Sequence, residues 1–86
     1  MSELYGLYHG RILGLARAAM PHGAWRAQLR EILAQFDEDC HRLSRLGRYV
    51  LRHELATQIE QEALQFSHPE KRAILTLALK HFDQTE

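Results

Sequence analysis

The side chains best suited to chemistry in this chain are six histidines and a single cysteine, Cys40. Glu38 and His41 lie three positions apart around that cysteine, so a helix there places a carboxylate and an imidazole on one face. Di-iron carboxylate bundles need two such pairs and two further carboxylates, and this chain supplies one pair. The HExxH and paired CxxC spacings of zinc sites are absent. We therefore expect no metal ion and no cofactor, with His41 in solvent and Cys40 as a small apolar filler.

Cys40 is also a conceivable nucleophile. A nucleophile needs an adjacent base and an oriented oxyanion site, and no nucleophile elbow or glycine-rich loop accompanies this cysteine. The glycine-rich phosphate-binding motifs of nucleotide-binding proteins do not occur either. We expect no catalytic residue and a protein that is not an enzyme.

A row of arginines follows Cys40. No acidic residue interrupts the segment up to His53, and on a helix the later arginines of this row project to one side. A tyrosine lies beside them, and an exposed tyrosine flanked by arginines is typical of interface hot spots. The predicted partner-binding residues are Arg42, Arg45, Arg48, Tyr49 and Arg52.

The charge of the chain is unevenly distributed, although its formal net charge is zero. Residues 1–53 hold eight arginines against five acidic residues, which gives +3, and residues 54–86 hold three basic against six acidic residues, which gives −3. A neutral total argues against a basic nucleic-acid coat. The segregation favours contact between the arginine row and a protein with an acidic surface; a solvated face is the plain alternative.

The composition indicates a cytoplasmic protein without membrane contact. One cysteine cannot close an intramolecular disulfide, so a secreted disulfide scaffold is excluded. No apolar run approaches the roughly 18 residues of a membrane span. The first 14 residues lack the basic start and continuous apolar core of a signal peptide.

The elements that must position the arginine row are all helical. Strong helix formers dominate, β-branched residues are scarce, and no stretch alternates apolar and polar residues as a strand does. Without a repeat or linker, residues 1–86 form a single domain. We predict the all-α class, as a small antiparallel bundle of three to four helices.

The periodicity predicts a first helix over residues 2–20, ended by Pro21. An apolar stripe that begins at Trp25 keeps its phase as far as Val50, so one long central helix over 24–52 is favoured over two helices with a break at Asp37. After this segment the phase changes. Either the chain breaks near His53, or the helix contacts one partner early and another late.

The final helix is predicted over residues 68–83. Ser67 is the expected N-cap, with Glu70 completing a capping box. Apolar residues cover more than half of this helix, which places it either in the centre of the bundle or against a second chain. Because a chain of this size buries only about 60% of its surface, we expect a homodimer, formed through the last helix or the long middle one.

The sequence thus predicts a non-catalytic helical module that docks on a protein partner as an adaptor, regulator or inhibitor. The alternative is a nucleic-acid-binding regulator that uses the same arginine row. If the chain broke at Asp37, residues 24–36 and 38–52 would faintly resemble the two helices of a helix-turn-helix. The short glycine-containing turn and a recognition face rich in Gln, Asn and Ser are missing.

Overall fold

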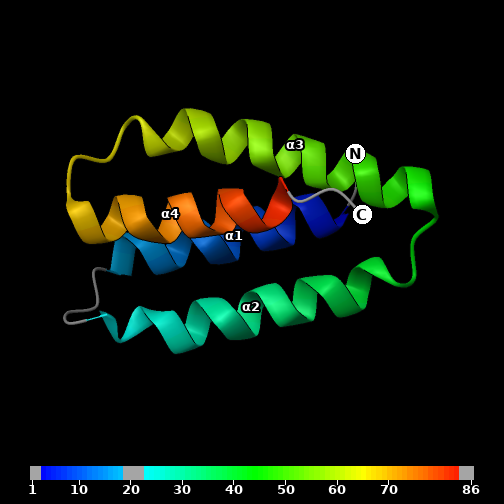
Figure 1. The fold of residues 1–86 in the computed structure, drawn as a ribbon, viewed down its shortest axis with the longest axis horizontal. Helices are drawn as coiled ribbons and strands as arrows, with labels where there is room; N and C mark the ends of the chain where they lie inside the picture. The colour runs from blue at the N-terminus through cyan, green and yellow to red at the C-terminus, as the bar shows by residue number, and fades with distance from the viewer. Residues whose placement is uncertain (1–2, 19–22, 84–86) are drawn as a thin grey trace.

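The computed structural model describes residues 3–18 and 23–83. This part of the chain forms four helices, α1 (Glu3–Ala18), α2 (Trp25–Cys40), α3 (Arg45–Ala63) and α4 (Pro69–Phe82), and contains no strand. Consecutive helices run in opposite directions (Figure 1). The predicted class, a small all-α antiparallel bundle, is confirmed.

The helices are arranged around a central pair. α1 and α4 pack against each other, with α3 on one side of them and α2 on the other, so α2 and α3 hardly touch (Figure 1). α4 contacts each of the other three helices. Its large apolar surface is therefore taken up inside one chain, through Ile74, Leu75, Ala78 and Phe82. This removes the need for a second chain at α4; the homodimer itself stays a prediction.

An aromatic cluster fills the centre of the bundle between α1, α2 and α4. The ring of Phe36 meets the ring of Tyr8 edge-on, with centroids 5.2 Å apart, and the ring of Phe82 at 4.7 Å. Such edge-to-face pairs add to the stabilisation that burial provides. All three side chains are buried, which anchors α2 to the central pair.

Polar contacts tie the helices together around this core. They join Tyr8 to Asp39 between α1 and α2, His9 to Glu62 between α1 and α3, and Trp25 to Glu70 and His81 to Asp37 between α2 and α4.

The favoured single helix over residues 24–52 is wrong. α2 ends at Cys40, and the chain turns through residues 41–44 before α3 begins. Ser44 is extended, and its hydroxyl accepts a hydrogen bond from the Gly47 N–H at 3.0 Å, which caps α3. The acidic run that begins at Asp37 lies in the last turn of α2, so the alternative break at that point is not observed either. The cap at Ser44 sets the start of α3, and the spacing of apolar residues does not predict this boundary.

α3 continues through His53 without a break. Its bundle-facing side chains are Leu51, Leu55 and Ile59, all buried, whereas Val50 of the earlier arc is exposed. The break near His53 is therefore not observed, and contact of the earlier arc with a partner stays a prediction. One arc of α3 packs on the bundle, and the other arc faces solvent.

The predicted cap of the last helix is also wrong. His68 is the N-cap of α4, and its Nδ1 accepts the Glu70 N–H at 3.2 Å. The Glu70 carboxylate accepts a hydrogen bond from the Trp25 indole, a partner 45 positions away, and therefore does not complete a local capping box with Ser67. The predicted start of the first helix at Ser2 and its end at Pro21 lie outside the described residues.

No helix in residues 3–18 or 23–83 is long and apolar enough to cross a membrane.

Candidate protein-interaction surface

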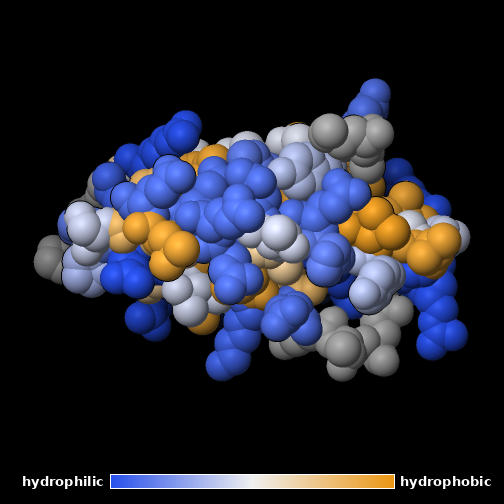
Figure 2. Space-filling model, turned by 90° about the horizontal axis from the view of Figure 1, so that it is seen from above, coloured by the Kyte–Doolittle hydropathy of each residue, from blue (hydrophilic) through white to orange (hydrophobic). Residues whose placement is uncertain are grey.

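The outward face of the first half of α3 carries large apolar side chains in solvent. Leu46, Tyr49 and Val50 are 71%, 66% and 42% exposed. Their i, i+3 and i+4 spacing places them on one face of the helix. Figure 2 looks onto the side of the molecule that carries α3, and hydrophobic surface appears toward both ends of this side. We call these three residues and His53 the α3 surface.

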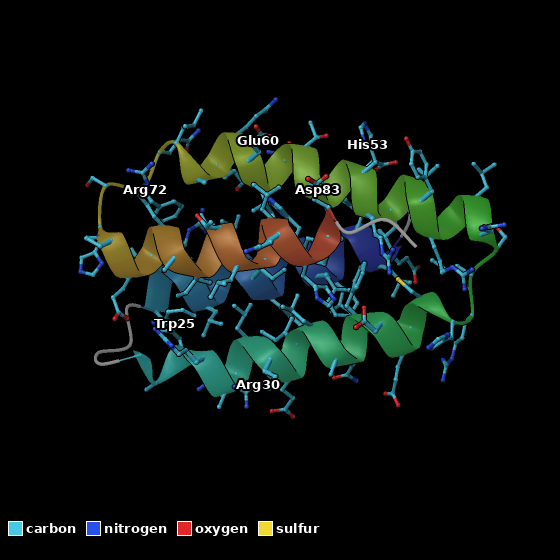
Figure 3. All side chains as sticks on the ribbon, in the orientation of Figure 1. Trp25, Arg30, His53, Glu60, Arg72 and Asp83 are labelled. Carbon is cyan, nitrogen blue, oxygen red and sulfur yellow. The ribbon has the colours of Figure 1, made fainter. Side chains whose placement is uncertain are left out.

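The α3 surface is exposed because the opposite side of the helix already fills the bundle. Leu51 and Leu55 are buried against the central pair, and at 100° per residue Leu46 and Val50 point away from them. His53 points outward from α3 (Figure 3). The Tyr49 ring stacks on the His53 ring, with centroids 6.0 Å apart and planes within 9°. This stacking orders the aromatic side chain on the surface.

The five predicted partner-binding residues do not all face the same way. Arg42, Arg45 and Tyr49 are exposed, and Arg42 and Arg45 lie at the same end of α3 as Leu46. Arg48 and Arg52 are half-buried and lie near the thiol of Cys40. The structure therefore keeps three of the predicted residues at the α3 surface and turns two toward the corner between α2 and α3.

Sequence reasoning missed the two aliphatic residues of the α3 surface. Val50 was expected in the buried stripe of the long helix, and Leu46 was not singled out. The change of hydrophobic phase after Arg52 is the signal that could have found them. This arc has no place in the bundle, and its side chains are exposed.

Cys40 is enclosed by the bundle. Its side chain is buried, and burial raises the pKa of the thiol, an effect that the nearby charge of Arg52 opposes. Glu38 and His41, the other residues of the candidate metal pair, are exposed. Within the described residues, no three His, Cys, Asp or Glu side chains are grouped so that they could hold a metal ion.

The arrangement that the nucleic-acid alternative requires does not form. In a helix-turn-helix, two helices joined by a short turn pack across each other at about 90–120°. α2 and α3 instead run antiparallel on opposite sides of the central pair (Figure 1). Binding of phosphates by the arginine row thus stays a prediction without this structural basis.

Comparisons with protein families, with curated proteins and with solved structures find no match to this chain.

Proposed function

We propose that this protein is a non-catalytic interaction module that docks on a protein partner through the α3 surface. The observation that supports the proposal is the joint exposure of Leu46, Tyr49 and Val50 on one helix face, beside Arg42 and Arg45. Tyrosine and arginine are the types enriched among residues that dominate binding energy. A rim of charge around an apolar centre is the usual anatomy of such interfaces.

Burial of the aliphatic side chains adds to the expected affinity. Moving a leucine or valine from water into a packed interface gains about 1.5–3 kcal/mol. Leu46 is more exposed than Val50, so burial of Leu46 against a partner contributes more binding free energy. Arg42 and Arg45 add selectivity for an acidic partner and speed its association, since complementary charges steer the encounter.

The charges along α3 also support a binding role for its first half. A helix dipole favours acidic residues in the first turn and basic residues in the last, by about 0.3–1 kcal/mol each. α3 has Arg45 in its first turn, no acidic residue there, and no basic residue in its last turn. The charge of Arg45 is therefore unfavourable for the helix dipole at the start of α3. We expect such a placement where the arginine contacts a partner.

The partner we propose is a protein with an acidic rim around an apolar pocket. In this complex Leu46 and Val50 enter the pocket, Tyr49 packs across its edge, and Arg42 and Arg45 meet the carboxylates. The module then acts as an adaptor, regulator or inhibitor by occupying that site.

The proposal is tested by capture from a lysate of the native host with Leu46→Asp. Leu7→Asp is the matched control, because Leu7 is 43% exposed on a different helix, α1. The wild type and Leu7→Asp should capture the same proteins. Leu46→Asp should weaken capture by about thirtyfold, as expected when a hot-spot residue worth about 2 kcal/mol is lost. Equal capture by all three proteins would exclude the α3 surface.

A titration with duplex DNA separates this proposal from the nucleic-acid alternative. Phosphate contacts give binding that weakens steeply with salt, with a slope near one per contact. We expect no duplex binding at about 50 mM salt. Tight, salt-sensitive binding that Arg42→Ala and Arg45→Ala abolish would replace a protein partner by a nucleic acid.

A further inference from the structure

A second surface lies between α2 and α4. These two helices border a groove of about 400 Å³ that opens to solvent. Leu29 and Leu33 of α2 and Leu77 of α4 form its apolar lining. Leu77 is 45% exposed and Leu33 is half-buried, so apolar surface remains for a ligand to cover.

Both walls of this α2/α4 groove are basic. Arg26 and Arg30 rise from α2 and Lys80 from α4, and all three are exposed. No acidic residue lines the groove within the described chain. The Arg26 guanidinium lies over the Trp25 ring at 5.5 Å from its centroid, which holds one of these charges at the groove.

Two carboxylates at the borders of the α2/α4 groove are already engaged by residues that line it. Trp25 lines the groove and donates its indole N–H to Glu70. His81 also lines it, and its Nε2 lies 2.9 Å from an Asp37 carboxylate oxygen. The two pairs join α2 to α4. Neither pair involves Arg26, Arg30 or Lys80, so these cations can contact a ligand.

The geometry points to a helix as the ligand. α2 and α4 run in the same direction (Figure 1), and an amphipathic helix laid between two such helices packs on both, as a bundle helix does. A fatty carboxylate fits less well. Its single carboxylate can pair with only one of the three cations, and in an open groove its alkyl chain would remain partly exposed to water. A helix instead covers the groove and presents its own polar face to solvent.

We propose that the α2/α4 groove binds an acidic amphipathic helix of a partner protein. The apolar stripe of this helix covers Leu33 and Leu77, and its acidic flanks meet Arg26 and Arg30 on one wall and Lys80 on the other. Because α2 and α3 lie on opposite sides of the central pair, this site is independent of the α3 surface. One molecule can then hold two partners at once, as an adaptor does.

The binding test uses a labelled synthetic peptide of about four helical turns, with leucines at i, i+3, i+4 and i+7 and glutamates on both flanks. A companion peptide carries lysines in place of the glutamates. Fluorescence anisotropy should show binding of the acidic peptide and none of the basic one. Binding should also shift the emission of Trp25, the one tryptophan of the chain.

Charge reversals locate the site. Arg30→Glu with Lys80→Glu should weaken binding of the acidic peptide by about tenfold. Arg72→Glu is the control, because this exposed arginine lies on the side of α4 toward α3 (Figure 3) and does not line the groove. It should leave binding within about twofold of the wild type.

Truncations test the apolar contact in the same way. Leu77→Ala should weaken binding several-fold, and Leu7→Ala on α1, where the leucine is 43% exposed, should not. Leu46→Asp should bind the peptide as the wild type does, which separates this site from the α3 surface. Absence of binding, equal binding of the basic peptide, a loss in Arg72→Glu as large as in the double reversal, or displacement by laurate would each overturn the proposal.

Discussion

At the scale of single residues, the buried phenol of Tyr8 shows how one polar group links two helices. Its hydroxyl donates to Asp39 in the last turn of α2, while its ring packs on Phe36. Burial, and then the hydrogen bond to the Asp39 carboxylate, raise the pKa of Tyr8 well above its ordinary value near 10. The neutral phenol is thus the form that the fold requires.

This shift predicts a loss of stability in alkali. Above about pH 10 the unfolded chain releases the Tyr8 proton and the folded protein retains it, so the free energy of unfolding falls as the pH rises. At about pH 8 we expect the free energy of unfolding of the wild type to exceed that of Tyr8→Phe by about 1 kcal/mol, the contribution of one hydrogen bond. Urea unfolding should show this difference shrinking above about pH 10. A difference that is the same at both pH values would contradict the assignment.

The arginine row shows the limit of residue-level reasoning. Arg45 and Arg48 were assigned to one side of a continuous helix, and both do lie on α3. In the structure Arg48 is half-buried near Cys40, whereas Arg45 is exposed. Spacing within one helix predicts which side chains share a face, but it does not predict what that face meets.

At the scale of the helices, α1 is weaker than its place in the central pair suggests. Gly10 and Gly14 are exposed, and an added Cβ at either position meets no atom within 4 Å. Each mid-helix glycine costs about 1 kcal/mol relative to alanine. α1 therefore relies on packing of its buried face more than on its own helix propensity.

Replacement of these glycines should stabilise the protein. We expect Gly10→Ala and Gly14→Ala each to raise the free energy of unfolding by about 1 kcal/mol. Gly23→Ala should instead lower it by about 1–2 kcal/mol, because Gly23 has a φ of 72°, a conformation unfavourable for residues with a Cβ. Thermal unfolding of the three variants gives the comparison. Destabilisation by Gly10→Ala would mean that the open face of α1 is not free of contacts.

The start of α3 provides a second test at this scale. Ser44→Ala removes the hydroxyl that caps α3 and should cost about 1 kcal/mol. Ser67→Ala is the matched control, since His68 provides the cap of α4, and it should change stability by less than about 0.5 kcal/mol. Chemical denaturation of both variants measures the contrast. Equal losses would show that Ser67 also caps a helix.

At the scale of the whole molecule, the central position of α4 limits where the predicted homodimer can form. The buried face of α4 packs on the other three helices, so we expect a second copy to use the exposed face of α3. Leu46 and Leu64 lie at the two ends of the outward face of α3, with His53 and Glu60 pointing outward between them (Figure 3). An antiparallel pair of α3 helices brings each basic half against an acidic half.

Sedimentation equilibrium tests this prediction. The wild type should show a concentration-dependent mass between monomer and dimer, and Leu46→Asp with Leu64→Asp should stay monomeric, because each buried aspartate would lack a partner. A wild type that is monomeric at every concentration would refute the dimer. That result would leave the α3 surface available to a foreign partner.

The amino-acid sequence was enough to predict the helical class and the antiparallel order. It also placed the last helix within a residue of its observed ends. These features depend on helix propensity and apolar spacing, which act between residues a few positions apart. The phase change after Arg52 predicted either a break near His53 or contact with two partners, and the exposed arc of α3 was not predicted.

Which side chains face solvent depends on tertiary packing, and spacing along the chain does not predict it. Trp25 meets Glu70 and His9 meets Glu62 across 45 and 53 positions of sequence, and no periodicity contains such pairings. The packing of α4 between the other helices determines that Leu51 is buried and that Leu46 is exposed. The exposure of a residue depends on its neighbours in space, and in this bundle those neighbours come from distant parts of the chain.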